Sequence, residues 1–160
     1  MKNIVFDAID SILKNNQNKL QIPLQQKAKF ERWLQIELAA ELYKLDPSTT
    51  IEYPYPKKRK TRADISSHGY LIELKTPNTN FKISNISSKP KPLSKNIKSA
   101  VEDIARLQRY DGKGMVAFVF FPVVDPSQLN IATIKNRLSN AQNIKDGISC
   151  KYFYIFVAEV

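Results

Sequence analysis

Residues 62–75 read RADISSHGYLIELK, and the arrangement of this stretch decides the predicted fold. Two β-rich segments flank the turn-forming sequence SSHG, which predicts an antiparallel hairpin. Asp64 lies in the first segment, and Glu73 and Lys75 lie two positions apart in the second. Alternate residues of a strand point to the same face, so the side chains of Glu73 and Lys75 leave the sheet together.

The length of the turn decides whether Asp64 shares that face with Glu73. A two-residue loop at Ser67-His68 or at His68-Gly69 keeps both carboxylates on one side, whereas a three-residue loop separates them. With the loop at Ser67-His68, Asp64 lies diagonally across from Glu73, roughly 7–8 Å away between backbones. Two carboxylates at that separation can share one divalent cation beside an ammonium group, which favours a nuclease site.

The excess positive charge of the chain lies on both sides of this hairpin. The net charge is +10, and two acid-free clusters account for all of it, because the rest of the chain has fifteen basic and fifteen acidic residues. This pattern favours binding of a phosphate backbone, and the alternatives are a solvated lysine surface or a disordered basic loop. The first cluster consists of Lys57, Lys58, Arg59, Lys60 and Arg62, and the second consists of Lys82, Lys89, Lys91, Lys95 and Lys98.

The bulk properties of the chain indicate one domain over residues 1–160. The longest apolar run, at 115–121, is too short to cross a bilayer, and the N-terminal stretch MKNIVFDAID lacks the features of a signal peptide. Cys150 is the single cysteine, which excludes an internal disulfide and a thiolate zinc site. We therefore expect a cytoplasmic enzyme that has no membrane association.

Apolar periodicity predicts alternating helices and strands that form a mixed sheet flanked by helices. The segment at about 77–96 is rich in Ser, Asn, Lys and Pro, which predicts a mobile basic loop placed to close over a ligand. The expected helices lie at about 3–16, 23–45, 97–110 and 126–140, and the expected strands lie at 50–55, on both sides of the turn within 62–75, at 115–121 and at 152–160.

Two glutamates intrude on the apolar face of the helix expected at 23–45. Glu37 follows Phe30 by seven residues, nearly two full turns, and therefore points in almost the same direction. Glu41 lies within the same arc. A carboxylate on a buried face needs a partner such as a cation, whereas one at the rim of the apolar stripe reaches water, and both readings remain open.

The order of elements and the spacing of Asp64 and Glu73-Leu74-Lys75 resemble the PD-(D/E)XK nuclease superfamily, which is the fold of many restriction endonucleases. The family core is a helix, a three-strand meander, a helix and a further strand, and residues at about 25–121 follow that order. The optional proline of the signature is absent, because Ala63 precedes the aspartate. The resemblance implies an α/β fold with an αβββαβ core, an extra N-terminal helix and a C-terminal helix-strand.

The resemblance also implies an Mg²⁺-dependent endonuclease that hydrolyses DNA phosphodiester bonds, with Mn²⁺ able to replace Mg²⁺. Asp64, Glu73 and the Leu74 carbonyl offer hard oxygen ligands, and Glu37 is the matching residue for a further metal contact, with Glu41 as second choice. Lys75 is expected to orient the attacking water or to contact the scissile phosphate. Since cutting both strands requires two sites, we expect a homodimer.

Other interpretations stay open. The chain could be a non-catalytic nucleic-acid-binding module on the same fold, a nuclease acting on RNA or branched DNA, or a domain whose basic loops bind an acidic partner. Glu73 and Lys75 could also simply pair with each other on an exposed sheet face. His68, the only histidine, is expected to be a turn residue because it lies in SSHG and no second histidine is present.

Overall fold

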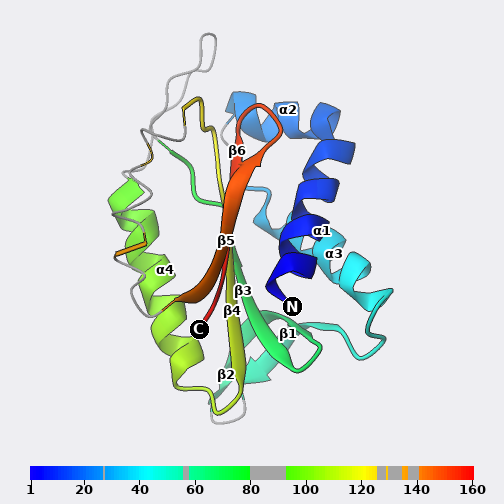
Figure 1. Ribbon diagram of the computed structural model, residues 1–160, viewed down its shortest axis with the longest axis vertical. Helices are drawn as coiled ribbons and strands as arrows, with labels where there is room; N and C mark the ends of the chain where they lie inside the picture. The colour runs from blue at the N-terminus through cyan, green and yellow to red at the C-terminus, as the bar shows by residue number, and fades with distance from the viewer. Residues whose placement is uncertain (27, 56–57, 80–92, 126–128, 130–134, 137–140) are drawn as a thin grey trace.

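The structure is a computed structural model that describes residues 1–26, 28–55, 58–79, 93–125, 129, 135–136 and 141–160 (Figure 1). It confirms the expected α/β class, because helices pack on a mixed sheet of six strands. The helices are α1 (Lys2–Asn15), α2 (Gln17–Gln26), α3 (Glu31–Tyr43) and α4 (Leu93–Gln108). The strands are β1 (Thr50–Tyr55), β2 (Lys58–Ser67), β3 (Tyr70–Lys75), β4 (Lys113–Phe120), β5 (Gln142–Ser149) and β6 (Phe153–Glu159).

The sheet has the strand order β1-β2-β3-β4-β6-β5. Neighbouring strands run antiparallel except for β3 and β4, which are parallel. A parallel pair needs a crossover connection, and α4 lies in the chain between these two strands. In Figure 1 the sheet is seen edge-on, with α4 on one side and α1, α2 and α3 on the other.

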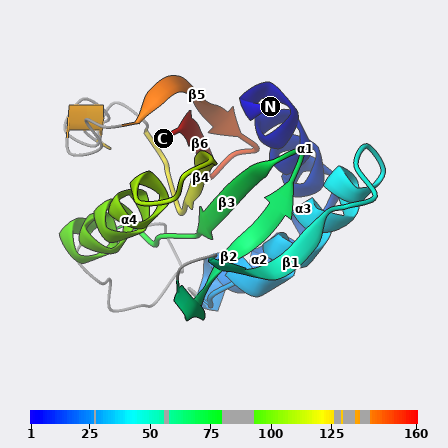
Figure 2. The same ribbon diagram turned by 90° about the horizontal axis from the view of Figure 1, so that it is seen from below.

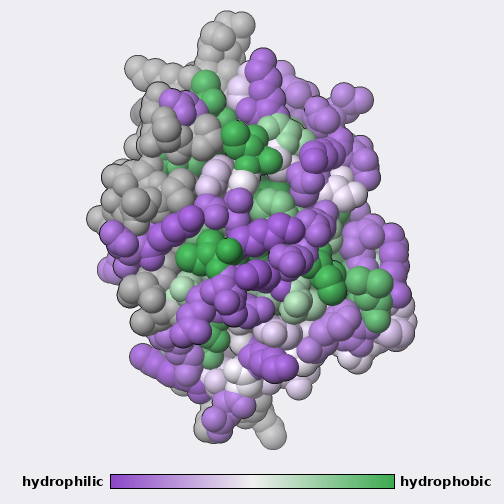
Figure 3. Space-filling view, in the orientation of Figure 1, coloured by the Kyte–Doolittle hydropathy of each residue, from purple (hydrophilic) through white to green (hydrophobic). Residues whose placement is uncertain are grey.

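β4 is covered on both faces, as its continuous apolar sequence predicts. Met115 and Ala117 belong to the core beneath α1 and α3, whereas Val116 and Phe118 belong to the core beneath α4. Each of these residues is at most 1 % exposed. A strand covered on both sides needs apolar residues at every position, which explains why its sequence does not alternate. On the face shown in Figure 3, hydrophilic side chains predominate and hydrophobic ones form smaller patches between them.

The prediction of a single helix at 23–45 is wrong, because two helices, α2 and α3, occupy this region. Pro23 does not begin a helix but lies in the last turn of α2. A proline there has no N–H to donate to the carbonyl of Lys19, and its ring crowds that carbonyl, so Pro23 weakens the helix, which ends three residues later. Phe30 precedes α3 with φ −119° and ψ 12°, so it lies outside the helix.

Several other boundaries differ from the expected ones. β2 begins at Lys58, so most of the first basic cluster lies in a strand and not in a connection, and α4 begins at Leu93 instead of residue 97. β5 is absent from the expected strands, because it is an edge strand whose sequence QNIKDGIS is largely polar. Edge strands often carry charged residues and glycine, which hide them from apolar pattern analysis.

The helix expected at 126–140 lies largely outside the described residues. Within this range, residues 135–136 are described as helical. Most of the expected basic loop, at 80–92, also lies outside them. Among the helices that the structure describes, none is both long and apolar enough to span a bilayer.

Candidate active site

The hairpin turn is the feature on which the predicted site depends, and it has two residues. Ser67 pairs with Tyr70, so His68 and Gly69 form the loop, with φ of 50° and 75°. Positive φ at both positions is typical of a type I′ turn, which matches the twist of the flanking strands. The even-numbered loop is thus confirmed, as is the prediction that His68 is a turn residue.

Asp64 lies where β2 and β3 stop pairing. The last backbone pair joins Ile65 to Ile72, and beyond it the two strands separate (Figure 2). Continued by one residue, this register sets Asp64 opposite Glu73, on the same face of the hairpin. The Asp64 carboxylate takes the place of a strand partner, because its Oδ2 accepts a hydrogen bond from the Leu74 N–H at 2.7 Å.

A buried glutamine on α3 fixes the backbone of Asp64. Gln35 is 3 % exposed, and its Nε2 donates to the carbonyl oxygen of Asp64 at 2.5 Å. Its Oε1 accepts a bond from Arg32 at 2.7 Å, so both ends of the amide are engaged. The position of Asp64 is therefore set from the helix layer as well as from the sheet.

Glu73 is 2 % exposed and accepts two hydrogen bonds on one oxygen. The Tyr55 hydroxyl donates to Oε1 at 2.8 Å, and Arg106 Nη1 donates to the same atom at 3.1 Å. Burial, followed by the charge of Asp64, raises the pKa of Glu73 to about 7. Both of these bonds fall on Oε1.

The ammonium group of Lys75 lies among three carboxylates from three different elements. Its Nζ is 3.6 Å from Glu31 Oε1, 3.9 Å from Asp64 Oδ2 and 3.6 Å from Asp103 Oδ2. Burial opposes the charge of Lys75, but these carboxylates outweigh it and raise its pKa. Lys75 is therefore protonated at neutral pH, which suits it to orient water or contact a phosphate and does not suit it to act as a base.

The helix glutamate that reaches Lys75 is Glu31 and not Glu37. Glu31 opens α3, and its Oε2 also accepts the Thr76 N–H at 3.0 Å. Glu37 lies six residues after Glu31, so its side chain leaves the helix about 240° around the axis from that of Glu31. Glu37 is half-buried. The expected direction of Glu37 rests on Phe30, a residue outside the helix. The second choice, Glu41, pairs with Lys44 at 2.7 Å.

α4 contributes two residues that the sequence analysis missed. Asp103 is 4 % exposed, and its Oδ1 lies 3.1 Å from Nη2 of Arg106. A signal was present in the sequence, because Asp103 is three residues after Ala100 and four before Leu107, both of which are buried. An acid on the apolar face of a helix needs a partner, and here the partners are Arg106 and Lys75.

Only part of the two basic clusters can be placed. Arg62 and Lys98 reach solvent, and Arg62 Nη1 donates to the Glu52 carbonyl at 3.3 Å. Lys57, Lys82, Lys89 and Lys91 lie outside the described residues, and of Lys58, Arg59, Lys60 and Lys95 only the backbone is described.

The donor set fits a divalent cation by charge and by chemistry. When all four carboxylates are ionised they outnumber the two cationic side chains by two, and all the candidate ligands are hard oxygens that suit Mg²⁺. The four are Glu31, Asp64, Glu73 and Asp103, and the cationic side chains are Lys75 and Arg106. In the described part of the chain, no three His, Cys, Asp or Glu side chains already converge as a metal-binding group.

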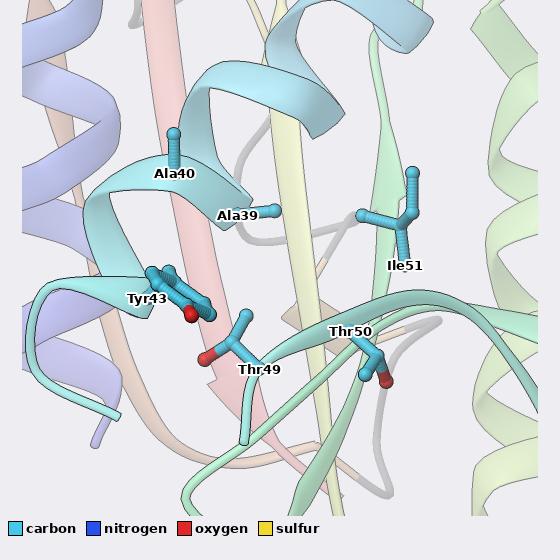
Figure 4. A pocket seen from close by; sticks show the side chains of 6 residues that line it. All are labelled: Ala39, Ala40, Tyr43, Thr49, Thr50 and Ile51. Carbon is cyan, nitrogen blue, oxygen red and sulfur yellow. The ribbon is translucent and has the colours of Figure 1, made fainter. Parts of the chain in front are cut away.

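An open pocket lies beside the C-terminal end of α3 (Figure 4), whereas Glu31 is the first residue of that helix. No acidic or basic side chain lines it, so it offers no group for metal or phosphate chemistry. The lining residues are Ala39, Ala40, Tyr43, Thr49, Thr50 and Ile51.

Comparison with protein-family models, with curated proteins and with solved structures finds no match.

Proposed function

We propose that the protein is a divalent-metal-dependent nuclease of the PD-(D/E)XK superfamily that hydrolyses phosphodiester bonds in DNA. The observation that carries the proposal is the position of Lys75, whose ammonium group lies within 4 Å of three carboxylates and two positions along β3 from buried Glu73. An Asp, a Glu and a Lys held together at the end of a hairpin are the residue types that phosphodiester hydrolysis needs.

The order of the elements supports the same proposal. Helix α3, strands β1, β2 and β3, helix α4 and strand β4 follow one another as in the family core, and β4 is parallel to β3. The strands β2 and β3 separate after three residue pairs, which exposes the Asp64 carboxylate to Leu74 and Lys75. α1, α2, β5 and β6 then extend this core.

In the proposed reaction, Asp64 and Glu73 would hold Mg²⁺ or Mn²⁺, with the Leu74 carbonyl as a further ligand. When bound, the cation would lower the pKa of a coordinated water molecule and neutralise charge on the phosphate. Lys75 orients the attacking water or contacts the scissile phosphate as a fixed positive charge. Glu31 takes the role that the family resemblance implies for Glu37.

DNA is the proposed substrate because the excess charge of the chain frames the site. All of the net charge of +10 comes from the two clusters before and after the hairpin. Arg62 in β2 and Lys98 in α4, one from each cluster, reach solvent. Positive charge so placed binds phosphates without regard to sequence. Cleavage of both strands would require two copies of the site, so a homodimer is the proposed form.

A substrate panel tests the function and its substrate class together. Supercoiled plasmid, single-stranded DNA, a four-way junction and RNA are each incubated with Mg²⁺ and with EDTA. We expect Mg²⁺-dependent cleavage of the plasmid in preference to RNA. Preferential cutting of RNA or of the junction would keep the chemistry and replace the substrate, and no cleavage of any of the four would overturn the proposal.

One observation favours a second candidate, a non-catalytic nucleic-acid-binding module. Arg106 and Tyr55 already satisfy Glu73 Oε1, as expected of a site that holds together without a metal. Calorimetric titration with Mg²⁺ separates the two functions. Binding that Asp64→Asn abolishes supports the nuclease, whereas wild-type protein that binds duplex DNA but not Mg²⁺ supports the module.

A further inference from the structure

Asp103 occupies an unusual environment for a carboxylate. It lies in α4, is 4 % exposed, and forms an ion pair with Arg106, whose Nη2 lies 3.1 Å from Oδ1. Its other oxygen, Oδ2, is buried, and none of the residues that the structure describes donates a hydrogen bond to it. Burial raises the pKa of Asp103, and Lys75 and Arg106 oppose that rise. A buried carboxylate oxygen without a hydrogen bond costs free energy, so its position calls for a reason.

The ammonium group of Lys75 lies close to that oxygen, with Nζ 3.6 Å from Oδ2. Glu31 Oε1 and Asp64 Oδ2 approach the same Nζ to 3.6 and 3.9 Å. An ammonium group has three N–H donors, and here three carboxylates from α3, β2 and α4 are available to them. Asp103 is the member of this set that comes from the layer on the α4 side of the sheet.

We propose that Asp103 is a positioning residue for Lys75, which makes α4 part of the site and not only of its scaffold. Asp103 holds the ammonium group from one side of the sheet while Glu31 holds it from the other. Without Asp103, Lys75 keeps its two partners on α3 and β2 and loses the one that fixes it toward Arg106 and Glu73. The consequence for catalysis rests on the proposed nuclease function, whereas the positional claim does not.

Nitrogen-15 NMR of the Lys75 ammonium group tests the positional claim without any reaction. Its signal, assigned by its absence from Lys75→Ala, is expected in the wild type because carboxylate partners slow proton exchange with water. We expect Asp103→Asn to lose the signal and Asp10→Asn to keep it. Asp10→Asn is a matched control, since it removes a carboxylate that pairs with Lys14 at 2.7 Å on α1. An unchanged signal in Asp103→Asn, or no signal in the wild type, would overturn the inference.

A double-mutant cycle tests whether Asp103 acts through Lys75. We expect Asp103→Asn to lower the rate of plasmid cleavage at saturating protein about tenfold, with DNA affinity unchanged. In a Lys75→Ala background the same change should have little further effect. Equal losses in both backgrounds would mean that Asp103 only docks α4 on the sheet. A wild type that cuts no substrate would refute the nuclease function, and the NMR result would still decide the position of Lys75.

Discussion

Arg106 of α4 donates from Nη1 to Oε1 of Glu73 on β3 at 3.1 Å, across 33 positions of the chain. The same arginine reaches Asp103 through Nη2, and Asp103 reaches Lys75. Lys75 and Glu73 are therefore linked through α4 as well as through β3. This network keeps four carboxylates together before any metal binds, because two internal cations offset part of their repulsion.

The pH dependence of stability should reveal the ionisation of Glu73. Burial and the charge of Asp64 raise its pKa from 4.5 to about 7 in the folded protein. The folded state thus binds this proton more tightly than the unfolded chain, and stability falls as the pH rises through that interval. When the pH rises from 4 to 8, the free energy of unfolding of the wild type should fall by about 3 kcal/mol more than that of Glu73→Gln, which has no carboxyl group to ionise at this position. Urea denaturation measures both proteins, and parallel pH profiles would contradict the prediction.

Mg²⁺ should stabilise the folded protein through the same carboxylates. A ligand that binds only the folded state at a hundred times its dissociation constant adds about 2.7 kcal/mol. We expect Mg²⁺ to raise the midpoint of thermal unfolding in the wild type and in Asp10→Asn, and EDTA to reverse the effect. Asp64→Asn should remove most of the increase. An equal increase in Asp64→Asn would show that the cation binds elsewhere.

Substitution of the helix glutamates should distinguish the two residues of α3. Glu31→Gln removes a carboxylate 3.6 Å from Lys75 Nζ, and we expect cleavage to slow by about tenfold. Glu37→Gln is the matched change on the same helix and should cleave at the wild-type rate. Initial rates of plasmid nicking under identical conditions compare them. The reverse order of the two rates would restore Glu37 as the helix residue of the site.

The hairpin turn should tolerate a new side chain that accepts positive φ, whereas a residue that disfavours positive φ should destabilise it. His68→Asn should fold and cleave like the wild type, because asparagine accepts positive φ readily. Gly69 has φ of +75°, and a methyl group added there would meet open space, so Gly69→Ala should cost about 1 kcal/mol through the backbone alone. Gly147→Ala is the control, since its new methyl would meet Phe6 Cζ at an ordinary 3.5 Å. Equal stability of the two alanine variants would refute the assigned turn.

Much of the fold follows from local patterns that the sequence displays. Asp64 and Glu73 share one face of a hairpin that has a two-residue turn, which depends only on residues of that hairpin. The apolar run of β4 is likewise visible within one element. The sequence does not predict the break between α2 and α3. A helix that contains Pro23 and ends before Phe30 is stabilised by tertiary packing, which local patterns do not show. β5 escaped for the opposite reason, since a polar edge strand is defined by its neighbour β6 and not by its own composition.

The site shows the same division between local and non-local information. Asp64, Glu73 and Lys75 lie on one hairpin, so their spacing predicted that they would meet if the turn had an even number of residues. Glu31, Asp103 and Arg106 reach them from α3 and α4, and their arrival depends on how each helix is rotated on the sheet. For Asp103 and Arg106 a clue existed in the buried helix face, whereas the choice of Glu31 over Glu37 required the true start of α3.

The most direct measurement is nicking of supercoiled plasmid in Mg²⁺ by the wild type, Glu73→Ala and Lys75→Ala, with Asp10→Asn as the control outside the site. The proposed function predicts cleavage by the wild type and by Asp10→Asn, none in EDTA, and a loss of at least about a hundredfold in both site variants. Circular dichroism and the unfolding midpoint verify that each variant is folded. Equal cleavage by all four proteins would contradict the assignment of the site.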